Sequence, residues 1–194
     1  MIVKNKKVDK NFEEYTVVLV KPDGVRRKII GEILSRFERV GLKLSATKLI
    51  WVDKTHAGKH YRDDDDYHKS VGVKTLENYE KYGLDANESL GTKDPVKIGK
   101  LMREWNMEFL SSGPVLATLW EGPGVILLVR KMLGNTFPYD SPPGTIRGDY
   151  SLDSSFNANV NRRPTQNLVH ASGSKEEAEL ERKLWFKEDE IYSY

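Results

Sequence analysis

The chain has 194 residues, 38% of them hydrophobic and 31% charged, which predicts one domain with a buried core and excludes a disordered chain. Its 31 basic and 29 acidic side chains are interspersed and leave a net charge of +2, which argues against a protein dedicated to binding nucleic acids or membranes. Cysteine is absent, which excludes disulfides, thiol catalysis and cysteine-ligated metals.

The chain shows no pattern of a secreted or membrane protein. Residues 1–15 become charged before an apolar segment develops, so no signal peptide is expected. The longest apolar run, residues 125–129, is too short to cross a bilayer. We therefore expect a soluble cytoplasmic protein.

The first half of the chain alternates strand and helix patterns. Residues 15–20 (YTVVLV) predict a buried strand that ends in a turn at KPDG, residues 21–24. Apolar residues at helical spacing between 29 and 40, followed by Gly41, predict a helix. Residues 42–51 predict a second strand beside the first.

The second half continues the alternation. Residues 53–112 predict helices and connections, with a clear helix entry at Asp94-Pro95. Residues 114–120 predict a strand, and residues 125–134 a short helix, although the periodicity alone would also allow a strand. Residues 134–166 predict a long loop, functional or disordered. Residues 166–171 predict the fourth strand, and Ser174 and Glu177 have capping-box spacing before a helix over 175–185.

This order of elements predicts an α+β fold, a ferredoxin-like α/β sandwich. Its four-stranded, mostly antiparallel sheet would be covered by helices, which we expect on one face.

Four side chains suggest phosphoryl transfer. His170 follows a buried strand and precedes a helix, where backbone amides and the helix dipole attract anions; the alternative is a histidine satisfied by local hydrogen bonds. Lys21 ends the first strand, although alone it would more often be solvated. Arg130 and Arg147 flank the glycine-rich loop, where guanidinium groups suit phosphate oxygens, although either could be a structural ion pair. No Walker motif accompanies them.

Five segments in order, VLVKPDGVRR, SSGPVLATLWEG, VRKMLGNT, SPPGTIRGD and NLVHASGS, resemble the motifs of the nucleoside diphosphate kinase family. The resemblance covers nearly the whole chain. It implies a ping-pong transfer of the γ-phosphoryl group between nucleoside tri- and diphosphates through a phosphohistidine on His170. It also implies homo-oligomers, hexamers or tetramers, and Mg²⁺ that arrives with the nucleotide phosphates rather than in a protein cage.

The resemblance assigns a role to each matching residue. Lys21 would meet the transferring phosphoryl group, and Tyr61 would lie near the histidine and the phosphate. The phosphate-binding residues would be Arg130, Thr136 and Arg147, Asn167 would contact the ribose, and Ser172 and Glu181 would support the imidazole.

The chain departs from the family pattern in several places. Ala171 and Gly173 replace the glycine and aspartate that follow the histidine in the family. Insertions at about 62–108 and 150–166 lengthen the single domain, 1–194. No residue is assigned to contact with the nucleotide base, although Tyr67 and Val71 are candidates. In the second insertion, Arg162 and Arg163 would either contact phosphate or be solvated.

Two other patterns are discounted as sites. His56 and His60 have i, i+4 spacing but no HExxH motif, so a solvated helix face is expected. Asp63 to Asp66 are expected to form a solvated, self-repelling loop, and a weak Ca²⁺ or Mg²⁺ contact is the minor alternative. The rival functions are a catalytically silent nucleotide-binding or regulatory domain of the same fold, and an RNA-binding module, for which no RNP1-like motif is present.

Overall fold

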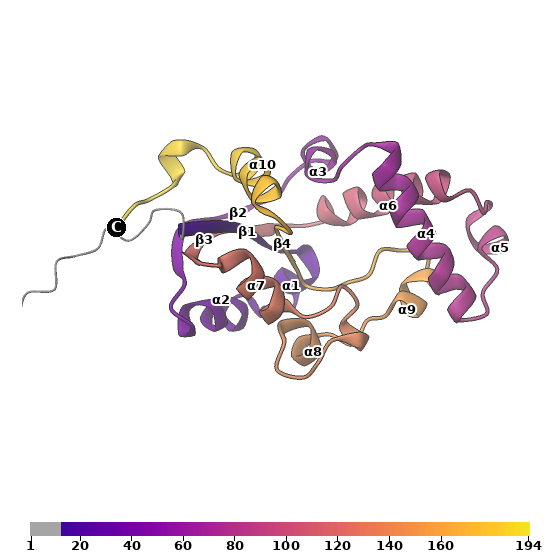
Figure 1. Ribbon diagram of the computed structural model, residues 1–194, viewed down its shortest axis with the longest axis horizontal. Coiled ribbons are helices and arrows are strands. Elements are labelled where there is room, and N and C mark those ends of the chain that lie inside the picture. The colour runs from indigo at the N-terminus through magenta and orange to yellow at the C-terminus, as the bar shows by residue number, and fades with distance from the viewer. Residues whose placement is uncertain (1–12) are drawn as a thin grey trace, which may run out of the picture.

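The computed structural model describes residues 13–194 and is built around a four-stranded sheet with the strand order β2-β3-β1-β4 (Figure 1). All three strand pairings are antiparallel. The strands are β1 (Glu13–Val20), β2 (Lys43–Ile50), β3 (Val115–Pro123) and β4 (Val169–Ala171). The predicted α+β class and ferredoxin-like sandwich are confirmed.

Helices fill the connections between the strands. Those in the first half are α1 (Pro22–Arg26), α2 (Ile30–Arg39), α3 (Lys54–His60), α4 (Asp65–Lys81), α5 (Ala86–Leu90) and α6 (Pro95–Leu110). Those in the second half are α7 (Val125–Leu133), α8 (Ile146–Tyr150), α9 (Ser155–Val160) and α10 (Lys175–Trp185), with 3₁₀ turns η2 (Pro138–Asp140) and η3 (Glu188–Glu190).

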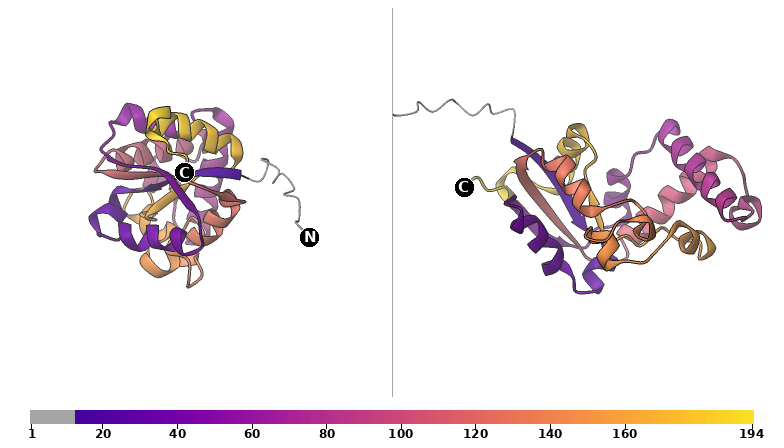
Figure 2. Two further views of the ribbon diagram at one scale, coloured as in Figure 1. Left: turned by 90° about the vertical axis from the view of Figure 1, so that its left-hand side faces the viewer. Right: turned by 60° about the horizontal axis from the view of Figure 1, so that its bottom comes forward.

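Helices cover both faces of the sheet, as the end-on view shows (Figure 2, left). On the central strand, Val18 and Val20 pack with α2 and α7, whereas Val17 and Leu19 pack with α3 and α10. The expectation of helices on one face was therefore wrong. The continuous apolar run of β1 is the physical reason, because a strand covered on both faces needs no polar alternation.

Two predicted loops are partly helical. The expected turn at residues 21–24 leads directly into α1, whose first helical position is Pro22, where its fixed φ and missing N–H are tolerated. The predicted loop 134–166 contains η2, α8 and α9. Side-chain caps begin α8 and α9, because the Thr145 side chain accepts a hydrogen bond from the Gly148 amide and the Ser154 side chain accepts one from the Asn157 amide.

Helices α4, α5 and α6 form a projection away from the sheet (Figure 1). It has its own apolar cluster, of Tyr79, Ala86, Leu90 and Ile98. At the crossing of α4 and α6, a Cβ added at Gly72 would overlap the Pro95 carbonyl, and one added at Gly99 would overlap the His68 carbonyl. The absence of these side chains therefore permits the close packing of the two helices.

The aspartate run starts α4 rather than forming a solvated loop. Asp64 accepts a hydrogen bond from the Tyr67 amide as the N-cap, and Asp65 and Asp66 lie in the first turn, where the helix dipole favours negative charge. Asp63 pairs with Arg103. The expectation of a loop was wrong for Asp65 and Asp66, which are helical, but the expected exposure to solvent holds for Asp63, Asp65 and Asp66. Capping and ion pairing disperse the repulsion.

The C-terminal residues pack on their own chain. Phe186 is buried against the α3 and α10 side of the sheet. The Tyr192 amide donates to Ser45 O at 2.9 Å, and the Tyr194 hydroxyl donates to Leu44 O at 3.0 Å. Through these contacts the tail packs on its own chain. Within residues 13–194, no helix combines the length and apolarity needed to cross a membrane.

Candidate active site

His170 lies in the middle of the short strand β4, opposite Leu19 of β1. Its neighbours Val169 and Ala171 point into the core on the α2 and α7 side. Because strand side chains alternate between faces, His170 points to the other side, toward α3 and α10. Its side chain remains 29% exposed, so it combines a rigid support with access to solvent.

The imidazole is oriented by a carboxylate and a hydroxyl. His170 Nε2 lies 2.6 Å from Glu181 Oε1, and Ser172 Oγ donates to Glu181 Oε2 at 2.6 Å. Burial acts to raise the pKa of Glu181, but the contacts with His170, His60 and Ser172 lower it overall. Glu181 is therefore ionised, and a neutral His170 holds its proton on Nε2 with a free lone pair on Nδ1.

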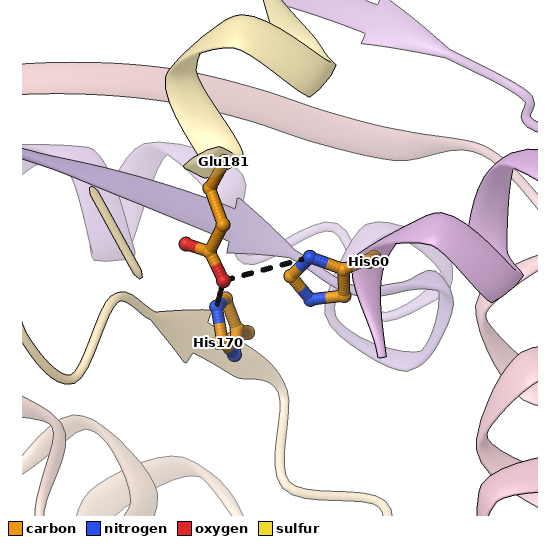
Figure 3. Close-up of side chains that lie close together, drawn as sticks. All are labelled: His60, His170 and Glu181. Carbon is orange, nitrogen blue, oxygen red and sulfur yellow. Dashed lines mark hydrogen bonds and ion pairs between the residues drawn. The ribbon is translucent and has the colours of Figure 1, made fainter. Parts of the chain in front are cut away.

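His60 joins this group, which the sequence interpretation missed. Its side chain is only 1% exposed, and His60 Nδ1 lies 3.5 Å from Glu181 Oε1 (Figure 3). The rings of His60 and His170 meet edge to face, with centroids 4.4 Å apart. The solvated helix face expected for His60 is thus wrong, because α3 turns this residue toward α10. The only feature of the sequence that points to a role for His60 in the site is its position next to Tyr61.

The remaining predicted residues line one cavity of about 970 Å³ together with His170. The cavity brings together the following predicted residues: Lys21, Tyr61, Arg130, Thr136, Arg147, Asn167 and His170. Ser172 and Glu181 lie behind the imidazole. Lys131 adds a positive charge to the lining and Glu177 a negative one, so cations dominate. A phosphate chain is the kind of ligand that such a cavity attracts.

Lys21 is buried at the end of β1 rather than solvated. Its backbone amide donates to Leu168 O at 2.8 Å, and its Nζ lies 5.2 Å from the centre of the Phe109 ring. Burial lowers its pKa to about 8, with nearby Asp23 partly opposing this shift. A bound anion would restore the pKa toward its usual value, so the site is prepared for negative charge.

Arg147 connects the glycine-rich loop to β4. Its guanidinium donates to the carbonyls of Gly134 and Asn135 in the loop, and of Asn167 and Val169 at β4. Burial, together with the charge of Arg130, lowers the pKa of Arg147 to about 10. These bonds occupy four of its five N–H groups, so Arg147 holds the loop as well as facing the cavity.

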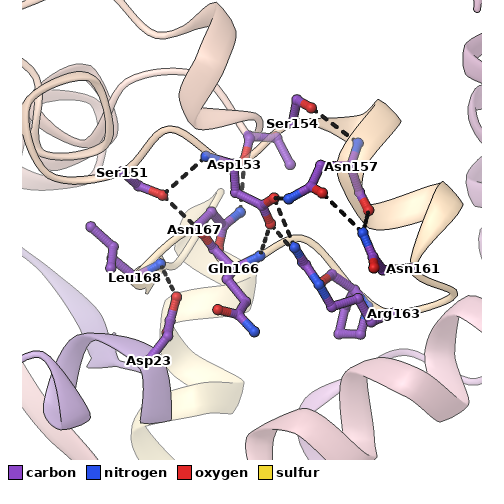
Figure 4. Close-up of polar contacts among 12 residues, drawn as sticks. Asp23, Ser151, Asp153, Ser154, Asn157, Asn161, Arg163, Gln166, Asn167 and Leu168 are labelled. Atoms are coloured by element: carbon purple, nitrogen blue, oxygen red, sulfur yellow. Dashed lines mark hydrogen bonds and ion pairs between the residues drawn. The ribbon is translucent and has the colours of Figure 1, made fainter.

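Asn167 and Asp23 fix the residues just before His170 (Figure 4). The Asn167 side-chain amide donates to Thr136 O at 2.7 Å, while Asp23 Oδ2 accepts from the Leu168 amide at 2.9 Å. Leu168 has a φ of 68°, an uncommon value for a branched side chain. Asn167 Oδ1 is buried and has no hydrogen-bond partner within residues 13–194.

Asp153 organises the approach to β4 and was missed by the sequence interpretation (Figure 4). Its carboxylate accepts two hydrogen bonds from Arg163, at 2.6 and 2.9 Å, and one from the Gln166 amide at 2.7 Å. Arg163 is therefore held in an ion pair rather than left solvated. No sequence signal identifies Asp153, because its partners lie up to 13 residues away in an irregular segment.

Tyr67 and Val71 are the candidates for contact with the nucleotide base. Neither is among the described residues that line the cavity. Asn106 of α6 lies in its wall instead. The sequence holds no signal for Asn106, which falls off the apolar face of its helix.

The described residues offer one cluster that could hold a metal, His60, His170 and Glu181, whose ligand atoms lie within 4.8 Å of one another. However, Glu181 already accepts from His170 and Ser172, and His60 Nδ1 lies near the Trp185 indole N–H at 3.4 Å. These contacts fit a network that orients a proton better than a metal site. The cavity itself has one carboxylate, Glu177, so it lacks the oxygen ligands of a Mg²⁺ cage.

Comparison with known sequences identifies one family. The family model described as nucleoside diphosphate kinase matches residues 14–72 and 97–191. A curated nucleoside diphosphate kinase from Pyrobaculum aerophilum is 40% identical over 178 residues, which cover 92% of this chain and 97% of the relative. A nucleoside diphosphate kinase from Pyrococcus furiosus is 39% identical over 184 residues, which cover 95% of this chain and 89% of the relative.

Solved structures agree with the sequence comparison. The crystal structure of an NDP kinase from Pyrobaculum aerophilum has a TM-score of 0.92 at 39% identity and covers 93% of this chain and 100% of that one. A nucleoside-diphosphate kinase from Borrelia burgdorferi, solved as a transition-state mimic with vanadate and ADP, has a TM-score of 0.75 at 34% identity and covers 95% of this chain and 94% of that one. With the motif order, the fold and the histidine-centred cavity in agreement, the chain belongs to the nucleoside diphosphate kinase family.

Proposed function

We propose that this enzyme transfers the γ-phosphoryl group of a nucleoside triphosphate to a nucleoside diphosphate through His170. In the first half-reaction Nδ1 of His170 forms a bond to the γ-phosphorus, the bond from phosphorus to the bridging oxygen breaks, and a nucleoside diphosphate leaves. In the second half-reaction a terminal oxygen of another diphosphate attacks the phosphohistidine and releases the imidazole. One cavity therefore serves both nucleotides.

The observation that carries this proposal is the contact of His170 Nε2 with an ionised Glu181 at 2.6 Å. It supports a neutral ring whose Nδ1 lone pair is available to a ligand in the cavity. As the phosphoryl group bonds to Nδ1 the imidazole gains positive charge, and Glu181 stabilises that charge.

The cavity residues fit the phosphate chain. Lys21, Arg130 and Arg147 supply positive charge where phosphoryl transfer develops negative charge on oxygen. Asn167 in the wall suits a ribose hydroxyl, and Thr136 and Tyr61 add hydroxyl donors. Mg²⁺ bound to the nucleotide phosphates would neutralise their charge, and the poverty of carboxylates in the lining fits its arrival with the substrate.

The first experiment is labelling without an acceptor. The wild-type chain, incubated with Mg²⁺ and γ-labelled ATP, should acquire an acid-labile, base-stable label that added GDP removes. His170→Asn should acquire none. His56→Asn, which changes a histidine outside the cavity, should label like the wild type.

The rival reading is a catalytically silent domain. If the folded wild-type chain binds the nucleotide but takes up no label, the phosphohistidine route is wrong and the silent domain replaces it.

We further propose that the enzyme acts in the cytoplasm as a homo-oligomer, a hexamer or tetramer. Strand β2 lies at the edge of the sheet, and at its end Leu49 and Trp51 are 60% and 67% exposed. The C-terminal tail bonds to this edge at Leu44 and Ser45, and the part of the edge beyond them, beside large apolar side chains, favours a protein neighbour. Light scattering on the purified chain measures the assembly state.

A further inference from the structure

His60 is the one histidine in contact with the nucleophile, and the reaction scheme gives it no role. It belongs to α3, which packs against α10, and it is not among the residues that line the cavity. Its Nδ1 lies 3.5 Å from the Glu181 oxygen that His170 contacts at 2.6 Å (Figure 3). Two imidazoles thus face a single carboxylate oxygen.

The indole of Trp185 indicates which nitrogen of His60 carries the proton. Trp185 Nε1 lies 3.4 Å from His60 Nδ1, and an indole N–H can only donate. A neutral His60 that accepts there has its proton on Nε2. Burial, reinforced by the neighbouring charge of His170, lowers the pKa of His60 to about 3, although Glu181 opposes this shift. The ring therefore remains neutral at physiological pH.

In this arrangement His60 Nδ1 accepts from Trp185 and offers no N–H to Glu181 Oε1. A donor at this place would compete with His170 for Glu181 Oε1 and weaken the hold on the Nε2 proton. The flat ring also limits rotation of His170, because the two imidazoles meet edge to face at an angle of 85°.

We propose that His60 is a positioning residue, whose neutral ring, fixed by Trp185, reserves Glu181 Oε1 for His170 and so keeps His170 Nδ1 unprotonated and facing the cavity. This inference rests on the proposed function, because it assigns His60 to the same nucleophile. His60 acts on the nucleophile alone, so its loss should slow the transfer without weakening nucleotide binding.

Three variants separate the parts of this arrangement. His60→Phe keeps an aromatic ring but removes the acceptor for Trp185, which leaves the indole N–H free to compete with His170 for Glu181 Oε1. His60→Asn places an amide oxygen near the position of Nδ1 and can accept from Trp185 again. His56→Phe is the matched control, because His56 packs on the same Trp185 ring with centroids 4.8 Å apart and lies one helical turn before His60.

Two measurements are made on each variant of the full chain. Quenched-flow labelling with Mg²⁺ and γ-labelled ATP gives the rate of phosphohistidine formation and the ATP concentration at half-maximal rate. Two-bond ¹H–¹⁵N spectra of histidine-labelled protein report the tautomer of His170, which a merely structural role of His60 would not change.

For His60→Phe we expect the rate of phosphohistidine formation to fall about tenfold, which is the usual effect of losing a residue that orients a functional histidine. The half-maximal ATP concentration should stay within about twofold, and His170 should shift toward the Nδ1–H tautomer. His60→Asn should recover most of the rate and the wild-type tautomer, and His56→Phe should leave both unchanged. If His60→Phe fails to fold, Trp185→Phe removes the same hydrogen bond from the other side and should shift the tautomer alike.

If folded His60→Phe keeps the wild-type rate and the wild-type tautomer of His170, the proposal is wrong. It is also wrong if His56→Phe has the same effects as His60→Phe, because the loss of packing on Trp185 would then be enough to explain them. Failure of the proposed function is a separate result. In that case the wild-type chain forms no phosphohistidine, while the tautomer of His170 still tests the role of His60.

Discussion

Lys21 shows how one residue can be costly for the fold and useful for the reaction. Its ammonium group is buried where desolvation disfavours its charge, so that its pKa falls to about 8. An anion in the cavity supplies the compensating charge that the empty protein provides only partly through Asp23. We therefore expect Lys21 to bind phosphate most strongly while it is protonated.

The pH dependence of the free enzyme should report this lysine. Because Lys21 loses its proton as the pH rises through about 8, we expect kcat/KM for the triphosphate to fall above that pH. Lys21→Met should be slow at every pH and lack this alkaline limb. Steady-state rates between pH 6 and 10 in roughly half-unit steps provide the test. If kcat/KM of Lys21→Met falls above about pH 8 in the same way, another group causes the fall.

At the scale of the element, the crossing of α4 and α6 depends on two glycines. Gly72 and Gly99 each approach the backbone of the partner helix so closely that a methyl group would overlap a carbonyl oxygen. Because a carbonyl cannot move aside as a flexible side chain can, the helices would have to separate. Gly31 of α2 has open space around the position of its missing Cβ.

Two matched substitutions test the crossing. Gly99→Ala should destabilise the protein by about 1–3 kcal/mol through overpacking. Gly31→Ala should stabilise it by about 0.4–1 kcal/mol, because alanine restricts the unfolded chain and suits a helix. Urea unfolding measures both, and hydrogen exchange should place the loss in Gly99→Ala in α4 and α6. Equal effects of the two changes would contradict this account.

For the whole molecule, the projecting helices brace the approach to the nucleophile more than they shape the cavity. The Tyr79 hydroxyl of α4 lies 3.5 Å from Asn159 O of α9, and Ser155 Oγ of α9 donates to Asn78 Oδ1 at 3.1 Å. Helix α9 then leads to the Asp153 network that holds Gln166. The family match omits residues 73–96, and none of them lines the cavity.

We therefore expect residues 73–96 to be removable. Gly72 packs directly on Pro95, so a short glycine-serine linker can join the helices. The shortened chain should still form the phosphohistidine, with a lower melting temperature and a higher half-maximal ATP concentration, because α9 loses its brace. Calorimetry and labelling measure these effects. A folded, shortened chain that takes up no label would show that the segment takes part in the chemistry.

The sequence predicted those features that depend on neighbouring residues. Apolar periodicity and caps located the strands and the long helices, and contiguous motifs located His170, Lys21 and Arg147, which the fold brings into one cavity. The sequence did not predict His60, because its environment is made by Glu181 and Trp185, more than 100 residues away. Asp153 was missed for the same reason, and α9 because its residues lack an apolar period.

The hydrogen bonds of Arg147 have a consequence for anyone who redesigns this enzyme. A substitution there removes a charge from the cavity and, at the same time, the ties between the carbonyls of Gly134 and Asn135 and those of Asn167 and Val169. Loss of activity in such a variant would mix altered substrate affinity with a displaced loop. A lysine could restore the charge but not the ties, since an ammonium group cannot reproduce the planar fork. Specificity for the phosphate chain should therefore be engineered at Arg130, and Arg147 kept as part of the scaffold.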